Sequence, residues 1–422
     1  MHKFNYLINI KKYCIYINLN ISYFIQKMES KLNEEKVIDP DLFEKIKQKY
    51  LALKKKSGSH SPNALSVQRD IPEIELKIDC CFISNPYATE LFMQRLKNAV
   101  SDEKWLYSQI ESYPAQNAQI AEDVSKYIGI KSENIFIGNG ATEIISALLD
   151  KFISGKILIL IPTFSPYYEY VNKKTTTIYY YPLHKEEDKF VCNLDLLFSY
   201  CIANEINNIV ITNPNNPDGS LIYKTSMKDF LERFSFMDNI LLDETFIEYT
   251  GTKESIIGSF YNYRNVTIIR SMSKIFGIAG IRAGYCITKE KYVKSLLDTG
   301  FLWNSNCFAI YFFSLLNDRE FMKEYEIAKT KYNEVLNKFA EQLQNCNEKI
   351  KFYKSKANIF LGELVNCGNK TAEDFMFEML YKYGIYIRDC SDKKGLNDKY
   401  FRISCRKEEE NEKIIQALKE FK

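Results

Sequence analysis

The feature that most constrains the fold is an alternation of short apolar runs with longer amphipathic runs through the middle of the chain. The apolar runs are NIFIG, KILILIP, NIVIT, NILLDE and VTIIRS, and helix-like segments such as TEIISALLDKFI and TSMKDFLERF lie between them. Strands that alternate with helices indicate βαβ units and a mostly parallel sheet with helices on both faces. In such sheets, chemistry collects at the carboxyl ends of the strands.

The C-terminal third follows a different pattern. Residues 291–343 are largely helical in pattern, and the later segments FYKSKANIFLGEL, AEDFMFEMLYKYGIYIRD and KYFRISCR are typical of strand, helix, strand and strand. This order predicts a smaller α+β domain. We therefore expect an extension over residues 1–70, an arm over 71–110 that packs with the small domain, a large domain over 111–300, and a helical connection with the small domain over 301–422.

The N-terminal extension divides into two parts. Its first 27 residues contain no acidic side chain, and we interpret them as a poorly ordered leader or an over-extended start, with Met28 as the true beginning. The later run LFEKIKQKYLALKKK predicts an amphipathic helix. This helix is expected to end at SGSHSPN, which we interpret as a linker.

Composition argues against several classes of function. The chain has 57 basic and 54 acidic side chains, a balance that does not favour a nucleic-acid-binding protein. No apolar stretch approaches the roughly 18 residues of a membrane helix. Eleven cysteines without a C-x-x-C motif indicate a reducing compartment, so we expect a cytoplasmic location. His2, His60 and His184 lie far apart, so neither a metal site nor a Ser-His-Asp triad is expected.

The most informative stretch is SMSKIFGIAGIRAGY, which begins at Ser271 and follows the apolar run VTIIR. A lysine among small and apolar residues has a lowered pKa, which frees its amine to attack a carbonyl group. Lys274 is therefore a candidate for a Schiff base. Ser271, Ser273 and Arg282 would hold a phosphate while the glycines let the backbone approach it. The alternative is a glycine-rich turn that carries one surface lysine.

Two further stretches support the first reading of Lys274. Asp243 ends the apolar run ILLD, where a buried carboxylate is costly unless it meets a cation such as a protonated pyridine nitrogen. The segment NPNNPDG follows NIVIT and is a turn by composition, which places the amide of Asn216 at the carboxyl end of a strand.

These motifs and others, taken in order, resemble the class I/II aminotransferases of the aspartate aminotransferase fold, which use pyridoxal 5′-phosphate. The matching stretches are SNP, SYPAQN, GNGATEII, PTFSPYYEY, NPNNPDG, LDETF, SMSKIFGIAGIRAGY, WNSN, ANIF and IRD with FRIS. The resemblance runs from about Asn85 to Arg402 and is strongest to the branch of histidinol-phosphate aminotransferase and threonine-phosphate decarboxylase. It implies an α/β fold in which a large domain has a mostly parallel seven-stranded sheet flanked by helices, with a smaller α+β C-terminal domain. It also implies a homodimer with shared active sites.

The resemblance implies a role for each matching residue. Lys274 would hold the cofactor and move protons, Asp243 would keep the pyridine nitrogen protonated, and Asn216 would bond the 3′ oxygen. Phe164 would stack on the ring, with Tyr167 as the alternative, although either could be a plain core aromatic. The phosphate ligands would be Gly140, Ala141, Thr142, Ser271, Ser273, Arg282 and, from the neighbouring subunit, Tyr113, which could also be only a turn anchor before Pro114.

Substrate recognition is expected to depend on two arginines. By resemblance, Arg402 grips the substrate carboxylate and Arg388 holds a second anion such as phosphate, while Asn85 helps to orient the substrate. The alternative for Arg388 is an ordinary ion pair with Asp389 or Glu363.

Two departures from the family pattern affect these expectations. Phe246 stands where transaminating members often have a tyrosine that bonds the 3′ oxygen beside Asn216. Cys405 and Arg406 follow FRIS where the family usually has a glycine, so the rim of the pocket is expected to differ.

The resemblance predicts an aminotransferase that moves an amino group from an anionic amine donor to a 2-oxo acid acceptor by a ping-pong mechanism. The first alternative is a decarboxylase of the threonine-phosphate type, which uses the same cofactor but breaks the bond to the carboxylate. The second alternative is a non-catalytic ligand-binding homologue, although an intact set of Lys274, Asp243 and Arg402 argues against it.

Overall fold

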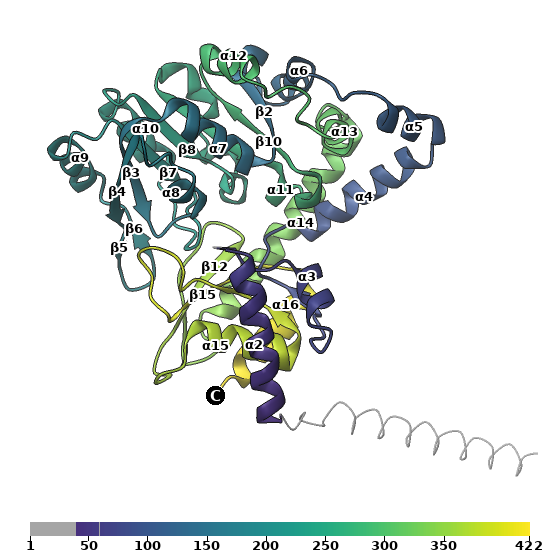
Figure 1. The fold of residues 1–422 in the computed structure, drawn as a ribbon, viewed down its shortest axis with the longest axis vertical. Helices are drawn as coiled ribbons and strands as arrows, with labels where there is room; N and C mark the ends of the chain where they lie inside the picture. The colour runs from purple at the N-terminus through teal and green to yellow at the C-terminus, as the bar shows by residue number, and fades with distance from the viewer. Residues whose placement is uncertain (1–38, 59) are drawn as a thin grey trace, which may run out of the picture. The chain divides into compact units, whose positions relative to one another are not determined.

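The computed structural model describes residues 39–58 and 60–422. The chain divides into two units, residues 1–52 and 53–422, and all strands in the described ranges belong to the second unit. Helix α2 spans Pro40–Lys56 and ends directly before SGSHSPN, as predicted (Figure 1). The proposed leader and the proposed start at Met28 lie outside the described residues. No helix in the described ranges combines the length and the apolar character needed to cross a bilayer.

A seven-stranded sheet forms the centre of the 53–422 unit. Its strands, in spatial order, are β2 (Ile135–Asn139), β10 (Ala283–Ile287), β9 (Val266–Ser271), β8 (Asn239–Asp243), β7 (Asn208–Thr212), β3 (Gly155–Ile161) and β4 (Thr176–Pro182). β10 runs antiparallel to both of its neighbours, and all other neighbouring pairs are parallel. The predicted mostly parallel seven-stranded sheet is therefore confirmed.

Side chains that alternate along each strand build a core on both faces of this sheet. On β7, Ile209 and Ile211 join one apolar cluster with Phe230, whereas Val210 joins another with Leu148. Helices cover both faces, so the central strands are buried throughout, as their continuous apolar runs predict. The sheet is thus a rigid base whose carboxyl edge can position polar side chains.

The remaining helices and short turns connect these strands. The α-helices are α3 (Ala64–Asp70), α4 (Pro86–Val100), α5 (Glu103–Glu111), α6 (Asn117–Ile128), α7 (Ala141–Phe152), α8 (Pro166–Glu169), α9 (Leu194–Ala203), α10 (Lys224–Arg233), α11 (Met272–Ile275), α12 (Glu290–Asp298), α13 (Cys307–Leu315) and α14 (Arg319–Leu343). The 3₁₀ turns are η1 (Ser132–Asn134), η2 (Ile247–Thr250), η3 (Thr252–Glu254), η4 (Ile257–Asn262) and η5 (Ala279–Ile281).

A second, antiparallel sheet follows α14. It consists of β11 (Ile350–Phe352), β12 (Ile359–Leu364), β15 (Tyr400–Ser404) and β14 (Arg388–Asp389), with helices α15 (Ala372–Tyr383) and α16 (Glu408–Glu420). Figure 1 shows these elements grouped in the C-terminal, yellow-green part of the chain. The β14–β15 register places Arg388 opposite Arg402, so the two predicted substrate arginines are direct neighbours on adjacent strands.

Four shorter strands complete the described structure. β1 (Ile78–Asp79) pairs in parallel with β13 (Ile385–Tyr386), and β5 (His184–Lys185) pairs with β6 (Phe190–Val191). The amide of Cys80 donates to the carbonyl of Tyr386, and the amide of Ser404 donates to the carbonyl of Cys80. The predicted arm therefore contacts the C-terminal sheet beside the two arginines.

Candidate active site

The candidate active site lies at the carboxyl ends of β8 and β9. These strands are parallel neighbours, so the residues that follow them meet at one edge of the sheet. Asp243 is the last residue of β8, and Lys274 lies in the single turn α11 directly after β9. Burial, together with the charges of Arg402 and Arg282, lowers the pKa of Lys274 to about 8, while Asp243 acts in the opposite direction. Four predicted residues are thus close enough to interact.

The backbone of Lys274 is anchored by two donors from distant segments. The amide of Asn85 and the hydroxyl of Tyr249 each donate to the Lys274 carbonyl at 3.0 Å. Tyr249 was not singled out from the sequence. Its position six residues after Asp243, in LDETFIEY, was the available signal.

Asp243 is a buried carboxylate held by two donors. The Tyr167 hydroxyl donates to Oδ2 at 2.9 Å, and the amide of Thr245 donates to Oδ1 at 2.8 Å. Burial raises the pKa of Asp243, and both hydrogen bonds lower it. No ion pair among the described residues includes Asp243, so a cationic ring nitrogen would complete its environment. Since Tyr167 is engaged by Asp243, Phe164 is the better candidate for the stacking ring.

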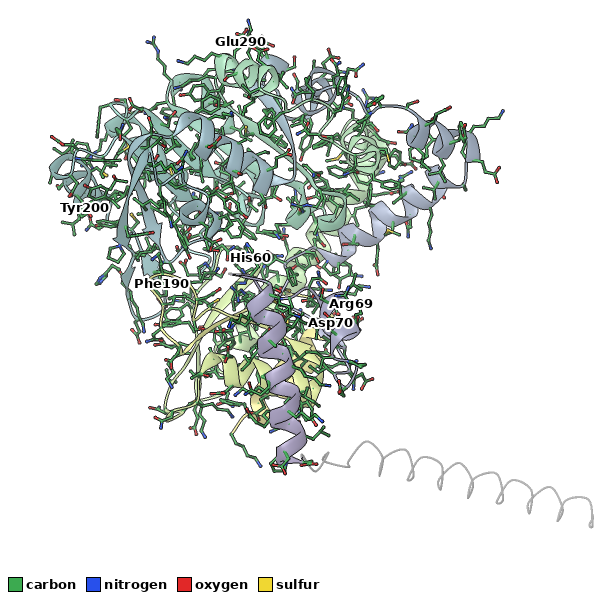
Figure 2. The ribbon with its side chains drawn as sticks, in the orientation of Figure 1. His60, Arg69, Asp70, Phe190, Tyr200 and Glu290 are labelled. Carbon is green, nitrogen blue, oxygen red and sulfur yellow. The ribbon has the colours of Figure 1, made fainter. Side chains whose placement is uncertain are left out.

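Phe164 lies beside this carboxylate system. Its ring centroid is 6.3 Å from that of Tyr167, in an edge-to-face arrangement, and 6.4 Å from that of His60. His60, labelled in Figure 2, follows the end of α2. Phe164 is only partly buried, which leaves ring surface accessible to a planar ligand.

A phosphate-sized cradle is formed where α7 begins. Gly140 adopts a left-handed φ of 80° as the N-cap, and no side chain caps the first amides of the helix. A Cβ on Gly140 would lie 2.2 Å from Nη2 of Arg282, so the guanidinium rests directly against this backbone. Helix amides and a neighbouring arginine are the ordinary donors for a phosphate.

The other predicted phosphate ligands lie on elements that converge on this cradle. Ser271 and Ser273 are buried at the start of α11, where Ser271 Oγ accepts the amide of Ser273 at 3.3 Å. Ala141 and Thr142 form the first turn of α7. The unpaired helix amides, the arginine beside Gly140 and the ion-pair-free Asp243 fit the phosphate and the ring nitrogen of pyridoxal phosphate.

Arg402 and Asn216, both predicted site residues, are joined by a hydrogen bond. Nη1 of Arg402 donates to Oδ1 of Asn216 at 2.8 Å, and Nη2 donates to the carbonyl of Cys81 at 2.7 Å. Its Nε is buried without a hydrogen-bond partner in the described chain. The Asn216 amide nitrogen is left available, and Arg402 retains a donor for an incoming anion.

Asn85 also has donor capacity left. Its Oδ1 caps α4 by accepting the amides of Tyr87 and Ala88, at 3.1 and 3.2 Å. Its Nδ2 is buried and has no partner among the described residues. A buried, unsatisfied amide is costly, so this group fits the predicted orienting role toward a ligand.

Arg388 lies in a group of charges that the sequence did not predict. Nη2 pairs with Asp392 at 2.6 Å, and Nη1 donates to Ser61 Oγ at 3.1 Å. Arg388 does form an ion pair, as the alternative expected, but with Asp392; Asp389 instead pairs with Lys54, and Glu363 pairs with Lys185.

Lys393 connects this group of charges to the segment that carries Phe164. It is 9% exposed, lies 3.8 Å from Asp392, and donates to Ser165 Oγ at 3.0 Å, next to Phe164. Partial desolvation, together with Lys393, lowers the pKa of His60. Ser61 was missed because SGSHSPN resembles a linker, although it supplies a buried hydroxyl to this group.

Tyr113 is 84% exposed and contacts the ring of Trp303, with 5.6 Å between centroids. No hydrogen bond joins Tyr113 to the phosphate cradle within the described chain, and its predicted role toward a neighbouring subunit stays a prediction.

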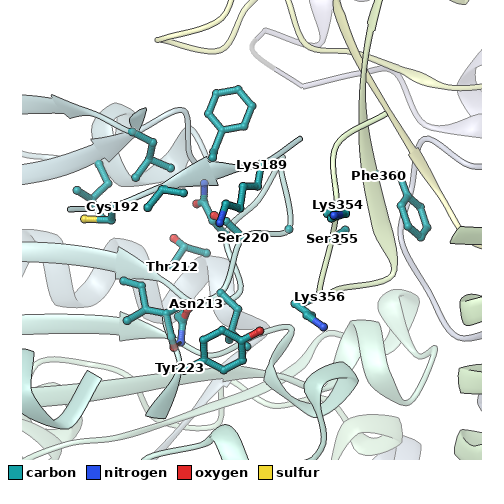
Figure 3. A pocket seen from close by; sticks show the side chains of 18 of the residues that line it. Lys189, Cys192, Thr212, Asn213, Ser220, Tyr223, Lys354, Ser355, Lys356 and Phe360 are labelled. Atoms are coloured by element: carbon teal, nitrogen blue, oxygen red, sulfur yellow. Dashed lines mark hydrogen bonds between the residues drawn. The ribbon is translucent and has the colours of Figure 1, made fainter. Parts of the chain in front are cut away.

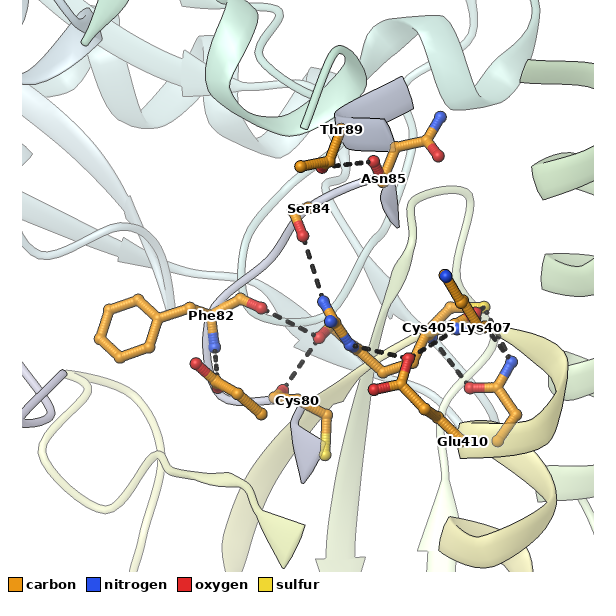
Figure 4. Close-up of polar contacts among 12 residues, drawn as sticks. Cys80, Phe82, Ser84, Asn85, Thr89, Cys405, Lys407 and Glu410 are labelled. Atoms are coloured by element: carbon orange, nitrogen blue, oxygen red, sulfur yellow. Dashed lines mark hydrogen bonds and ion pairs between the residues drawn. The ribbon is translucent and has the colours of Figure 1, made fainter. Parts of the chain in front are cut away.

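The two departures from the family pattern have structural explanations. Phe246 is buried in a small apolar cluster with Ile83, Ala357 and Ile359, so its ring joins the arm to the C-terminal sheet. Arg406 donates to Ser84 Oγ at 3.1 Å and pairs with Glu410 at 3.6 Å (Figure 4). This departure therefore links the arm to α16.

A cavity of about 700 Å³ lies on the other side of the NPNNPDG turn (Figure 3). Its lining includes Asn213, Gly219, Phe190 and Phe360, and Lys274 is not among the residues that line it. This cavity is therefore lined by residues other than Lys274, Asp243 and Arg402.

Comparison with known proteins identifies the family of this chain. The family described as aminotransferase class I and II matches residues 86–418. An L-serine phosphate decarboxylase from Campylobacter jejuni is 41% identical over 383 residues, which cover 90% of this chain and 97% of that protein. A solved decarboxylase from Sulfurospirillum multivorans has a TM-score of 0.82 and 36% identity, and covers 89% of this chain and 95% of that one. A histidinol-phosphate aminotransferase from Methanococcus aeolicus is 30% identical over 316 residues, 74% of this chain and 82% of that protein.

These relatives correct one expectation. The predicted transamination between an amine donor and a 2-oxo acid is wrong, because the relatives at 36–41% identity are decarboxylases. The residues that hold the cofactor serve both reactions, so they could not distinguish them. The predicted cofactor and family branch are confirmed, and the chain belongs to the class I and II aminotransferase family as a pyridoxal-phosphate-dependent enzyme.

Proposed function

We propose that the chain is a decarboxylase of a phosphorylated amino acid of the L-serine phosphate type. The main support is the match to an L-serine phosphate decarboxylase over 97% of that protein's length. The basic group of Arg402, Arg388 and Lys393 offers a chemical reason, because such a substrate carries a carboxylate and a phosphate on one short skeleton. Two anions that close together need separate cationic partners.

The positions of the cations suggest a division of labour. Arg402 is bonded to Asn216 and lowers the pKa of Lys274, so it suits the carboxylate next to the reacting carbon. Arg388 and Lys393, with the hydroxyl of Ser61, suit the phosphate. Asp392, which bridges Arg388 and Lys393, would be displaced in part by the stronger phosphate dianion.

The reaction breaks the bond between Cα and the carboxylate carbon. Bound pyridoxal phosphate supplies an electron-accepting ring that takes up the electron pair left when carbon dioxide departs. Asp243 would hold a proton on the ring nitrogen, and the hydrogen bonds from Tyr167 and Thr245 oppose the rise in the pKa of this carboxyl that burial causes. The side chain of Lys274, in its ammonium form, would then supply a proton to Cα in place of the lost carboxylate, so L-serine phosphate yields carbon dioxide and phosphoethanolamine.

The test is turnover of L-serine phosphate by the cofactor-loaded protein. We expect release of carbon dioxide and phosphoethanolamine in equal amounts, much slower reaction with L-serine, and no turnover by Lys274→Ala. Arg388→Met should raise KM for L-serine phosphate about 10- to 100-fold, since it removes a charged hydrogen-bonding partner. L-Threonine phosphate serves as a second substrate that tests whether an added methyl group is accepted.

Two results would contradict the proposal. One is the absence of carbon dioxide from every phosphorylated amino acid tested. The other is an Arg388→Met variant that is equally impaired with L-serine and with L-serine phosphate, because the arginine would then not distinguish the phosphate.

We also propose that the enzyme is a homodimer in a reducing compartment such as the cytoplasm. Several apolar side chains close to one another in sequence or contact are exposed in the described chain: Tyr107, Ile110, Tyr113, Leu302 and Trp303. A patch of this kind supports a protein interface. The ten described cysteines are free thiols, which supports the reducing compartment.

A further inference from the structure

β14 and the turn that follows it carry the two cations assigned to the substrate phosphate, Arg388 and Lys393. Asp389, which is 1% exposed, shapes this turn by accepting the Ser391 amide at 2.9 Å and the Ser391 hydroxyl at 3.0 Å. Arg388 precedes Asp389, while Asp392 and Lys393 follow it. The conformation of the turn therefore decides where these charges lie.

A buried carboxylate beside an anion-binding group needs its own counter-charge. Without one, Asp389 would place an uncompensated negative charge next to Arg388 and weaken attraction for a second anion. The structure supplies Lys54, which bonds Asp389 and also lies 3.0 Å from Glu373 on α15. Burial raises the pKa of Asp389, but the charge and hydrogen bond of Lys54, together with the hydrogen bonds from Ser391, bring it below its ordinary value, so this carboxyl is held ionised.

Lys54 itself is well placed for this task. Its side chain is 16% exposed, and burial lowers its pKa while Asp389 and Glu373 raise it above the ordinary value. Lys55 and Lys56, its neighbours in the last turn of α2, are exposed. Only Lys54 of the three connects the end of this helix to β14.

We propose that Lys54 is a positioning residue for substrate specificity: by neutralising Asp389 it holds the 389–393 turn so that Arg388 and Lys393 meet the substrate phosphate. The inference rests on the proposed function and deepens it, since nothing in the sequence pattern connects the N-terminal extension to the substrate. Lys54 does not touch the reacting atoms. Its removal should therefore change recognition of the phosphate more than the chemical step.

The experiment compares Lys54→Met, Lys54→Arg and the matched control Lys55→Met in the full-length, cofactor-loaded protein. We expect Lys54→Met to raise KM for L-serine phosphate roughly tenfold with kcat within about twofold of wild type, and to leave L-serine turnover unchanged. Lys54→Arg should recover most of the affinity, and Lys55→Met should behave as wild type. Binding of phosphoethanolamine and of inorganic phosphate, measured by calorimetry, should weaken by the same factor.

A second variant separates positioning from loss of folding. Lys54→Met/Asp389→Asn contains no unpaired buried charge, and the asparagine oxygen still accepts from Ser391, so phosphate affinity should return to within about threefold of wild type. The inference is overturned by wild-type KM in Lys54→Met, by equal losses with L-serine and L-serine phosphate, or by a double variant no better than Lys54→Met. If the wild-type protein releases no carbon dioxide, the proposed function fails, while the calorimetric comparison still tests Lys54.

Discussion

Lys274 determines how the site responds to pH. A lysine amine attacks a carbonyl group only when it is neutral, and burial among Arg402 and Arg282 lowers the pKa of Lys274 to about 8. The neutral fraction therefore rises as the pH increases toward 8 and is nearly complete above it. In cofactor-free protein, the rate of covalent attachment of pyridoxal phosphate should rise about tenfold per pH unit below this value and then level off.

Arg402→Met provides the control for this pH profile. Removing a cation beside Lys274 makes its ammonium form less unfavourable, so the midpoint of the attachment profile should move upward. A midpoint near the ordinary lysine value of about 10.4 in the wild-type protein would contradict the buried, cation-flanked environment.

The positions of single residues follow most directly from the sequence where they coincide with the end of an element. Asp243 ends an apolar strand and Lys274 begins the next turn, so their convergence follows from parallel pairing. Tyr167 and Lys393 were not predicted as partners, because a phenol or ammonium group reveals its acceptor only after the chain has folded. The sequence separation of Tyr167 and Asp243 is 76 residues, beyond any local pattern.

The N-terminus of α7 is the element on which the cofactor phosphate is expected to depend. Gly140 has a φ of 80°, and an added Cβ would lie 2.2 Å from Arg282 Nη2. Gly140→Ala should therefore both strain the backbone, at a cost of about 1–2 kcal/mol, and displace the guanidinium from the cradle. We expect weaker retention of pyridoxal phosphate, measured by titrating cofactor-free protein, with a lower melting temperature.

Gly258→Ala is the matched control, because a Cβ there meets no atom within 4 Å and the backbone is not left-handed. It should leave cofactor affinity unchanged. Wild-type affinity in Gly140→Ala would show that the α7 amides and Arg282 do not form the phosphate site together.

At the level of elements, periodicity predicted most of the large sheet and its helices. TEIISALLDKFI and TSMKDFLERF correspond to α7 and α10, and the strand-helix-strand-strand order after Lys349 corresponds to β12, α15, β14 and β15. The pairing of β1 with β13 could not be predicted, since two-residue strands carry no periodic signal. Their register nevertheless brings the arm next to Arg402.

At the scale of the whole molecule, the reaction itself was the least predictable property. The lysine, the aspartate and the phosphate cradle serve transamination and decarboxylation alike, since both reactions use the same electron-accepting ring. The choice depends on which bond at Cα is aligned for cleavage, and under the proposed function that alignment would follow from where Arg402 and Arg388 hold two anions. The two arginines lie side by side because of the register between β14 and β15. The sequence spacing suggested that they are neighbours, but it did not give the directions in which their side chains point.

The proposed dimer can be tested through its shared active sites, because mixing two inactive variants would restore activity only if each site draws residues from both subunits. Tyr113 is 84% exposed, and the resemblance assigns it to the phosphate of a neighbouring subunit. In a hybrid of Lys274→Ala and Tyr113→Ala chains, one site would then combine an intact lysine with an intact tyrosine. Random mixing should restore about a quarter of wild-type carbon dioxide release, because half of the dimers are hybrids with one competent site each.

If Tyr113 instead served its own chain, every hybrid would have one defect in each site, and mixing would restore nothing. Purification through two different affinity tags, one on each variant, establishes that hybrid dimers have formed, so a failure to recover activity would count against the shared site.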